Sequence, residues 1–138
     1  MKYMLDTCVL SELVKSSPDS KVLQWFEARK PHELCISSMT LGELQRGVNR
    51  LAPSKRRSAL TSWLEEIESG FEDRVLAYDA KVAKVWAQMT VDAEASGKSI
   101  AAFDSIIAAT ARAYGCKLVT RNVRDFTNAG VETIDPWG

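Results

Sequence analysis

Histidine is nearly absent from this chain of 138 residues, since His32 is the only one. Its scarcity argues against Ser-His-Asp triads, histidine-rich zinc sites and acid–base chemistry by paired histidines. If the protein is an enzyme, its carboxylates must therefore carry the reaction. Cysteine is scarce as well. Cys8, Cys35 and Cys116 are odd in number and lie in apolar stretches, which favours reduced thiols in the core and a cytoplasmic location.

Long apolar runs and a net charge are also missing. No stretch approaches the ~20 apolar residues of a membrane-spanning helix, and Asp6 interrupts any signal peptide, so we expect no membrane partner. The 18 basic and 18 acidic side chains cancel, which argues against strong nucleic-acid binding. If four acids gather in one site, however, 18 basic side chains face 14 acidic ones elsewhere, and the surface allows local nucleic-acid binding.

Four acidic residues stand out because each interrupts an apolar or small-residue context. They are Asp6, Glu43, Asp104 and Asp125. The sharpest case is Asp104, which lies in the run 99–111, where every other residue is small or apolar and none is cationic. A buried carboxylate without compensation is strongly destabilising. A metal ion shared among several carboxylates is the simplest compensation.

Short apolar segments alternate with amphipathic ones along the chain. Strands are predicted at 2–5, 34–36, 75–78 and 117–120, with a candidate edge strand at 133–134. Helices are predicted between them, at 17–30, 38–51, 55–71, 79–93 and from about Asp104 to 114, and a helix or turn begins at 11–14. No repeat or linker divides the chain. We therefore expect one domain, 1–138, in which helices cover both faces of a parallel sheet of four to five strands.

Capping residues predict where several helices begin and end. Ser17 is the expected N-cap of the first long helix, with Pro18 in its first turn and Pro31 as its stop. Gly115 is the expected C-terminal cap of the helix that carries Asp104. A loop is expected at 121–125, after the strand that ends at Thr120.

This architecture brings the four acids to one edge of the sheet. Asp6 and Asp125 follow strands directly, whereas Glu43 and Asp104 lie early in helices that run antiparallel to the strands. All four therefore belong to the carboxyl edge, where ligands bind in open parallel sheets.

An acid cluster of this kind predicts a particular chemistry. Carboxylates without histidine or cysteine form an oxygen-only site, which suits Mg²⁺ or Mn²⁺ rather than Zn²⁺. The fitting reaction is metal-assisted hydrolysis of a phosphodiester. Thr7, Ser105 and Thr120 are candidates to hold the carboxylates or position waters, although each is also an ordinary cap or turn residue.

Each acid taken alone also has a structural explanation. Asp6 is suited to cap a helix at the end of a strand. Glu43 is suited to pair with an arginine one turn later on its own helix. Asp125 is suited to a loop in which Arg121 or Arg124 holds it.

Four ordered segments, 3–13, 36–47, 103–111 and 118–126, together with the terminal Pro136-Trp137, resemble the motifs of PIN-domain ribonucleases of the VapC type. The Thr-Arg-Asn at 120–122 and the Pro-Trp ending most resemble the FitB-like branch. The resemblance implies a three-layer α/β/α fold and an Mg²⁺- or Mn²⁺-dependent endoribonuclease that acts as the toxin of a type II toxin–antitoxin pair. It also implies an antitoxin partner whose tail inhibits the site, contact with DNA only through that antitoxin, and a homodimer or larger complex.

The resemblance assigns the metal to Asp6, Glu43 and Asp104, but the fourth acidic position departs from the family pattern. Asn122 stands where many relatives carry an acid, and Asp125 lies three residues further on. We expect Asn122 to lie nearer the metal and tune its affinity, with Asp125 acting from outside the ligand set.

The flanking Arg121 and Arg124 are expected to hold Asp125 or to contact RNA phosphates. An apolar surface that includes Trp25, Phe26 and Trp63 is expected to receive an antitoxin segment, unless these aromatics fill the core.

Two other functions remain compatible with the sequence. A PIN-like partner of a DNA-binding antitoxin with a regulatory, non-cleaving role is favoured by Asn122 and opposed by the three intact acids. A phosphotransferase that uses Asp6 as acceptor is opposed by the lack of a following Asp-x-Asp pattern and of a glycine-rich phosphate loop.

Overall fold

A single sheet of five parallel strands runs through the computed structural model, which describes all residues, 1–138. The strands are β1 (Tyr3–Leu5), β2 (Leu34–Ser37), β3 (Val75–Leu76), β4 (Lys117–Val119) and β5 (Thr133–Ile134). They lie in the order β3-β2-β1-β4-β5, and every neighbouring pair is parallel. The prediction of a parallel sheet of four to five strands is confirmed, and 133–134 forms its edge.

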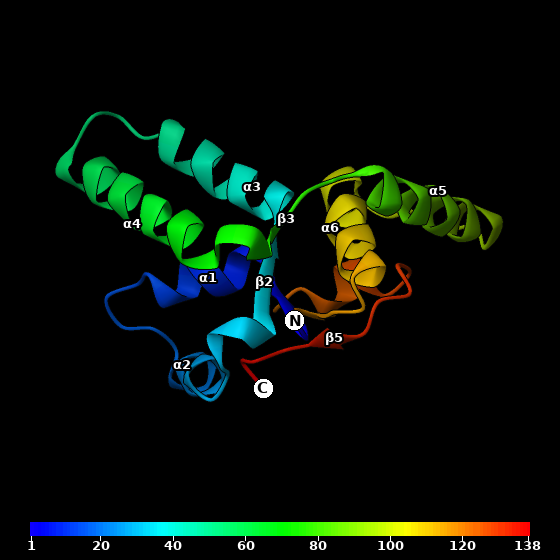
Figure 1. Ribbon diagram of the computed structural model, residues 1–138, viewed down its shortest axis with the longest axis horizontal. Helices are drawn as coiled ribbons and strands as arrows, with labels where there is room; N and C mark the ends of the chain where they lie inside the picture. Colours follow the sequence, from blue (N-terminus) through cyan, green and yellow to red (C-terminus); the bar gives the residue numbers. More distant parts are fainter.

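Six α-helices cover the two faces of this sheet (Figure 1). They are α1 (Thr7–Leu13), α2 (Ser20–Glu27), α3 (Ser38–Asn49), α4 (Lys55–Phe71), α5 (Ala80–Ala95) and α6 (Ala102–Ala113). Three short 3₁₀ helices, η1 (Pro31–Glu33), η2 (Glu72–Arg74) and η3 (Val123–Phe126), connect them to strands. The fold is the three-layer α/β/α arrangement that the sequence predicts. None of the helices combines the length and apolar composition needed to span a membrane.

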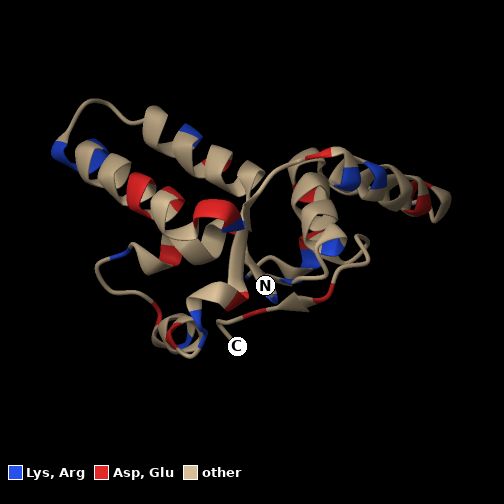
Figure 2. Cartoon of the chain, viewed as in Figure 1, with Lys and Arg blue, Asp and Glu red and all other residues tan.

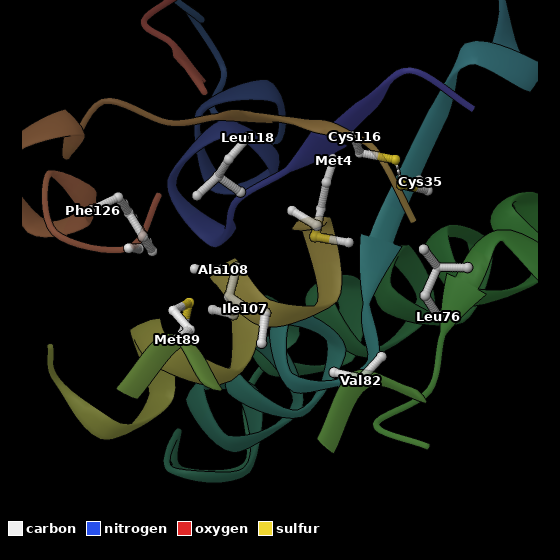
Figure 3. Close-up of a cluster of buried hydrophobic side chains, with 13 residues drawn as sticks. Met4, Cys35, Leu76, Val82, Met89, Ile107, Ala108, Cys116, Leu118 and Phe126 are labelled. Carbon is white, nitrogen blue, oxygen red and sulfur yellow. Dashed lines mark hydrogen bonds between the residues drawn. The ribbon is translucent and has the colours of Figure 1, made fainter. Parts of the chain in front are cut away.

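Alternation along the strands explains why both faces are covered. Met4 and Leu118 belong to the core beneath α5 and α6, whereas their neighbours Leu5 and Val119 belong to the core beneath α1 to α4. All four side chains are fully buried. Figure 3 shows the first of these cores, in which strand residues meet Ile107 of α6. Because every strand residue must be apolar to sit between two layers, polar side chains are confined to the ends of the strands.

Two of the expected helix starts are wrong. Asp19, not Ser17, caps α2, because its carboxylate accepts hydrogen bonds from the backbone N–H groups of Lys21 and Val22. The first helix begins at Thr7 rather than at 11–14, since Asp6 already acts as its N-cap. The expected loop at 121–125 contains most of η3. In each case a carboxylate or a 3₁₀ turn forms hydrogen bonds with backbone N–H or C=O groups, and the hydrophobic pattern of the sequence does not predict such bonds.

Gly47 and Gly115 predict opposite responses to the same substitution. Gly115 follows α6 with φ +67°, and the N–H groups of Gly115 and Cys116 donate to Arg112 and Ala111, so it forms the expected cap. Gly47 lies in α3 with ordinary φ, and a Cβ there would meet no atom within 4 Å.

We therefore expect Gly47→Ala to stabilise the protein by roughly 0.5–1 kcal/mol. Gly115→Ala should destabilise it by about 1 kcal/mol, because a Cβ is strained at positive φ. Urea unfolding of the two variants measures both changes. Loss of stability in Gly47→Ala would mean that the exposed face of α3 is packed against something.

Candidate active site

The order of the strands reverses between β1 and β4. From β1 the chain first builds outward to β2 and β3, and it then returns to the other side of β1 to add β4 and β5. Ligands bind at the carboxyl ends of the strands where the order reverses in this way. Asp6 follows β1 and Thr120 follows β4 at this point, because Leu5 and Val119 pair in register and the Asp6 N–H donates to the Val119 carbonyl at 2.9 Å.

Asp6 is held rigidly at this edge of the sheet. Its Oδ1 accepts a hydrogen bond from the Thr7 N–H, and its Oδ2 accepts one from the Thr120 hydroxyl, both at 2.8 Å. Only 7% of the residue is exposed. Burial raises the pKa of this carboxyl, and the Asp125 charge adds to the effect, while the hydrogen bonds from Thr120 and Thr7 oppose it. A buried carboxylate with both oxygens already oriented is a fixed anchor.

Glu43 reaches the same edge from α3. The Thr7 hydroxyl donates to its Oε1 at 3.2 Å, so Thr7 links Glu43 to Asp6 through two adjacent groups of one residue. Burial raises the pKa of Glu43, and the charge of Asp6 raises it further against the Thr7 hydrogen bond. The alternative in which an arginine of α3 pairs with this acid is wrong, because the ion pairs of the molecule are Lys15–Glu12 and Lys117–Glu132.

Asp104 lies in the first turn of α6 and is half-buried. None of the side-chain hydrogen bonds or ion pairs of the molecule involves its carboxylate. Burial, followed by the charges of Asp6, Asp125 and Glu43, raises the pKa of Asp104 to about 6. Because Coulomb interactions of this size fall off quickly with distance, the four acids predicted from the sequence are neighbours in the fold.

The two candidates for the fourth position differ in their surroundings. Asp125 is exposed, is paired with neither Arg121 nor Arg124, and raises the pKa values of both Asp6 and Asp104 through its charge. Asn122 is exposed too, and its backbone N–H donates to the Thr120 hydroxyl at 3.0 Å. Asn122 therefore helps to orient Thr120, whereas Asp125 adds a charge to the cluster.

Ser105 is directed away from the acids. Its hydroxyl donates to the Ala102 carbonyl and accepts a hydrogen bond from the indole of Trp86 at 2.9 Å, so it fastens α6 to α5. Arg124 is exposed, and its side chain makes no hydrogen bond or ion pair. The Arg121 guanidinium lies 5.0 Å from the ring centre of Trp137, so the C-terminal Pro-Trp supports the loop that follows β4.

Cys8 is the site neighbour that the sequence assigned only to the core. Its Sγ lies 3.6 Å from the Thr120 Oγ1 and 3.9 Å from the Asp6 Oδ2, and it accepts a hydrogen bond from the Arg121 N–H. The sequence could have indicated this position, because in a helix that begins at Thr7 the second residue, Cys8, lies close to the N-cap Asp6. Burial raises the pKa of this thiol, so it stays a neutral packing group.

The donor set fits a hard divalent cation. All of the acids offer oxygen, and none has a protein cation to neutralise it. As the side chains stand, no three of them converge closely enough to hold an ion. Asp6 is fixed by its hydrogen bonds, so closing around an ion falls to the half-exposed side chains of Glu43 and Asp104.

Known proteins resemble this chain over almost its whole length. The PIN domain family model matches residues 3–131. The VapC ribonuclease Y4jK of Sinorhizobium fredii is 38% identical over 135 residues, which cover 97% of this chain and 96% of that protein. Toxin FitB of Neisseria gonorrhoeae is 36% identical and covers 97% of each chain. Among solved structures, that of FitAB bound to an IR36 DNA fragment has a TM-score of 0.92 at 34% identity and covers 99% of this chain and 96% of the matched chain.

The raised pKa of Asp104 makes the stability of the metal-free protein depend on pH in a defined direction. In the folded protein this pKa is about 6, against an ordinary value of 3.8, so the folded state binds the proton first as the pH falls. Ionised Asp104 therefore destabilises the fold fully above about pH 6, and this penalty declines as the pH falls from about 6 toward 3.8.

Asp104→Asn should therefore melt at a higher temperature than wild type at about pH 8 in EDTA, and the difference should shrink toward about pH 5. Thermal melts at both pH values measure it. Asp73→Asn, which changes an exposed acid in η2, is the matched control, and its melting temperature should differ little from that of wild type at either pH. An Asp104→Asn difference that does not change with pH would contradict the charge coupling.

Proposed function

The chain belongs to the PIN domain family, and on that premise we propose that it is the ribonuclease toxin of a toxin–antitoxin pair and hydrolyses RNA phosphodiester bonds. The family resemblance inferred from the motifs is confirmed. The observation that supports the reaction is the position of Asp6, Glu43 and Asp104 at the carboxyl edge of the sheet, where the charges of Asp6 and Glu43 raise the pKa of Asp104 and no protein cation pairs with any of the three. Such an edge suits a substrate that arrives with its own negative charge and a divalent ion.

We assign the ion to Asp6, Glu43 and Asp104 and propose Mg²⁺ or Mn²⁺, because all of the donors are carboxylate oxygens. When bound, a divalent cation neutralises the acids and the scissile phosphate and makes water a better nucleophile. Asp6 supplies the fixed ligand, since Thr7 and Thr120 hold both of its oxygens. Glu43 and Asp104 are free to turn toward the ion, because neither is buried on all sides.

We propose Asp125, rather than Asn122, as the fourth acid. Its charge acts on both Asp6 and Asp104, and no arginine neutralises it. An exposed, unpaired carboxylate beside the cluster is suited to orient an attacking water. The role of Asn122 is then to orient Thr120 through the hydrogen bond that its backbone N–H donates to the Thr120 hydroxyl. This assignment differs from the expectation drawn from the family pattern, in which Asn122 lies nearer the metal.

We propose that the partner is an antitoxin protein and that DNA is contacted only through that antitoxin; among the similar solved structures, FitAB is bound to a DNA fragment. We propose that an antitoxin segment packs near Trp25, Phe26 and Trp63, which are half-buried against the core of α1 to α4 and leave part of each ring exposed. We further propose that 1–138 forms one domain, since β5 completes the sheet beyond the matched residues, and that the toxin is cytoplasmic and dimeric or larger.

Cleavage of RNA by the purified protein is the direct test of this function. Wild type should cleave single-stranded RNA with Mg²⁺ or Mn²⁺, and EDTA should stop it. Asp6→Asn and Asp104→Asn should each lower kcat by at least about 100-fold, because the transition state loses a ligand to the ion. Circular dichroism should show both variants folded. Folded wild type that cleaves no RNA with either ion would support the regulatory, non-cleaving alternative instead.

The fourth acid has its own comparison. Asp125→Asn should lower kcat by about 10-fold or more, because a charge beside the cluster is lost without a change of shape. Asn122→Ala should change it little, because the backbone N–H to Thr120 remains. Mg²⁺-dependent thermal shifts of both variants separate ion binding from turnover. A reversed order of the two effects would assign the fourth position to Asn122.

A further inference from the structure

The charges of the hairpin formed by α3 and α4 are separated along its length. From 44 to 64 the chain contains five cations and no acidic residue. They are Arg46, Arg50, Lys55, Arg56 and Arg57. The acids of α4 all lie in its second half, nearer the sheet, so Figure 2 shows basic segments at the outer end of the hairpin and acidic ones toward the sheet. None of the five cations forms an ion pair.

Two of these arginines continue the face of α3 that carries Glu43. Arg46 and Arg50 lie three and seven residues after Glu43, which places them on one side of a helix with 3.6 residues per turn. That side is turned away from the buried Leu44 and Val48, and both arginines are exposed. At 1.5 Å per residue, the row extends about 10 Å from Glu43 toward the outer end.

Gly47 leaves this face open between the two arginines. It is exposed, and a Cβ at this position would meet nothing within 4 Å. No apolar side chain interrupts the row, whereas grooves that receive protein helices or strands are built around apolar anchors. A row of unpaired cations with an unobstructed helix backbone between them is suited to a phosphate chain.

We propose that this face of α3 binds the sugar-phosphate backbone of single-stranded RNA and leads it from the acid cluster toward the outer end of the hairpin. The inference rests on the proposed function and locates its substrate. The acid cluster itself repels RNA, and a net charge of zero supplies no general attraction, so nearby cations must retain the strand. A row of about 10 Å allows its two arginines to contact neighbouring phosphates of one strand, and such contacts are independent of base sequence.

The first test removes the two charges on the row. The double variant Arg46→Gln/Arg50→Gln should raise KM about tenfold for a single-stranded RNA of about ten nucleotides and leave kcat unchanged, because the acids are intact. The slope of log(kcat/KM) against log[salt] should fall by about 1.4, for two lost phosphate contacts. Lys84→Gln/Lys98→Gln removes two exposed cations from α5 and the turn after it, on the opposite side of the molecule, and should change neither quantity.

The second test adds one negative charge to the row and keeps the size of the added side chain constant. Gly47→Gln and Gly47→Glu place side chains of nearly equal size at an exposed position where a Cβ meets nothing within 4 Å, and both favour helix more than glycine does. Gly47→Glu should raise KM severalfold above that of Gly47→Gln, and the excess should fade at high salt. Equal KM values for the two variants would overturn the electrostatic role of the face.

The outcomes separate this inference from the proposed function. If wild type cleaves no RNA with either ion, the proposed function fails. If wild type cleaves and the Arg46→Gln/Arg50→Gln variant keeps its KM and salt slope, only the present inference fails. Binding can also be measured without cleavage, in an Asp6→Asn background, with fluorescent oligouridylate and fluorescent polyglutamate as probes. The added Arg46→Gln/Arg50→Gln changes should weaken the binding of oligouridylate. If they weaken only the binding of polyglutamate, RNA binding at this face is overturned and the face is assigned to an acidic protein segment.

Discussion

The structure depends on a set of carboxylates gathered at one edge of a sheet without a protein cation to neutralise them. Asp6 is the centre of that arrangement, since its two oxygens bind the Thr7 N–H and the Thr120 hydroxyl and so join β1, α1 and β4. The hydrogen bonds stabilise its charge but do not cancel its repulsion of Asp104, whose pKa is raised to about 6. Repulsion of this kind favours a cation at the end of the central strand, because a cation neutralises the carboxylates while they remain ionised.

The layers around the sheet make this concentration of charge tolerable. Both faces of β1 are buried, so the apolar positions stabilise the sheet while the polar groups gather at its carboxyl edge. The same helices that cover the sheet also deliver acids to that edge, because α3 and α6 begin there. Two of the unpaired cations of the α3–α4 hairpin, Arg46 and Arg50, lie on the face of α3 that carries Glu43. We therefore assign the attraction of a polyanion to the same helix that supplies one of the candidate site acids.

Several features were predictable only in part. The strands, the caps at Ser37 and Asp79, and the glycine after α6 follow from residues close in sequence, and all are present. The start of α2 could not be predicted, because Ser17 and Asp19 are both good N-caps. The structure uses Asp19, whose own N–H donates a hydrogen bond to the buried Glu12. Ser105 was expected near the acids, yet a tertiary hydrogen bond from Trp86 directs its hydroxyl into the helix interface.

The sequence by itself determined the parallel α/β architecture and singled out Asp6, Glu43, Asp104 and Asp125 as candidate site acids, because periodicity, capping and an uncompensated carboxylate in an apolar run are local properties of the chain. The tertiary structure alone decided how those acids interact. Asp6 and Thr120 are separated by 114 positions, and the hydrogen bond between them exists only because β1 and β4 pair. The electrostatic coupling of Asp125 to Asp6 and Asp104 has the same origin, since charges sense distance in space and not separation along the chain.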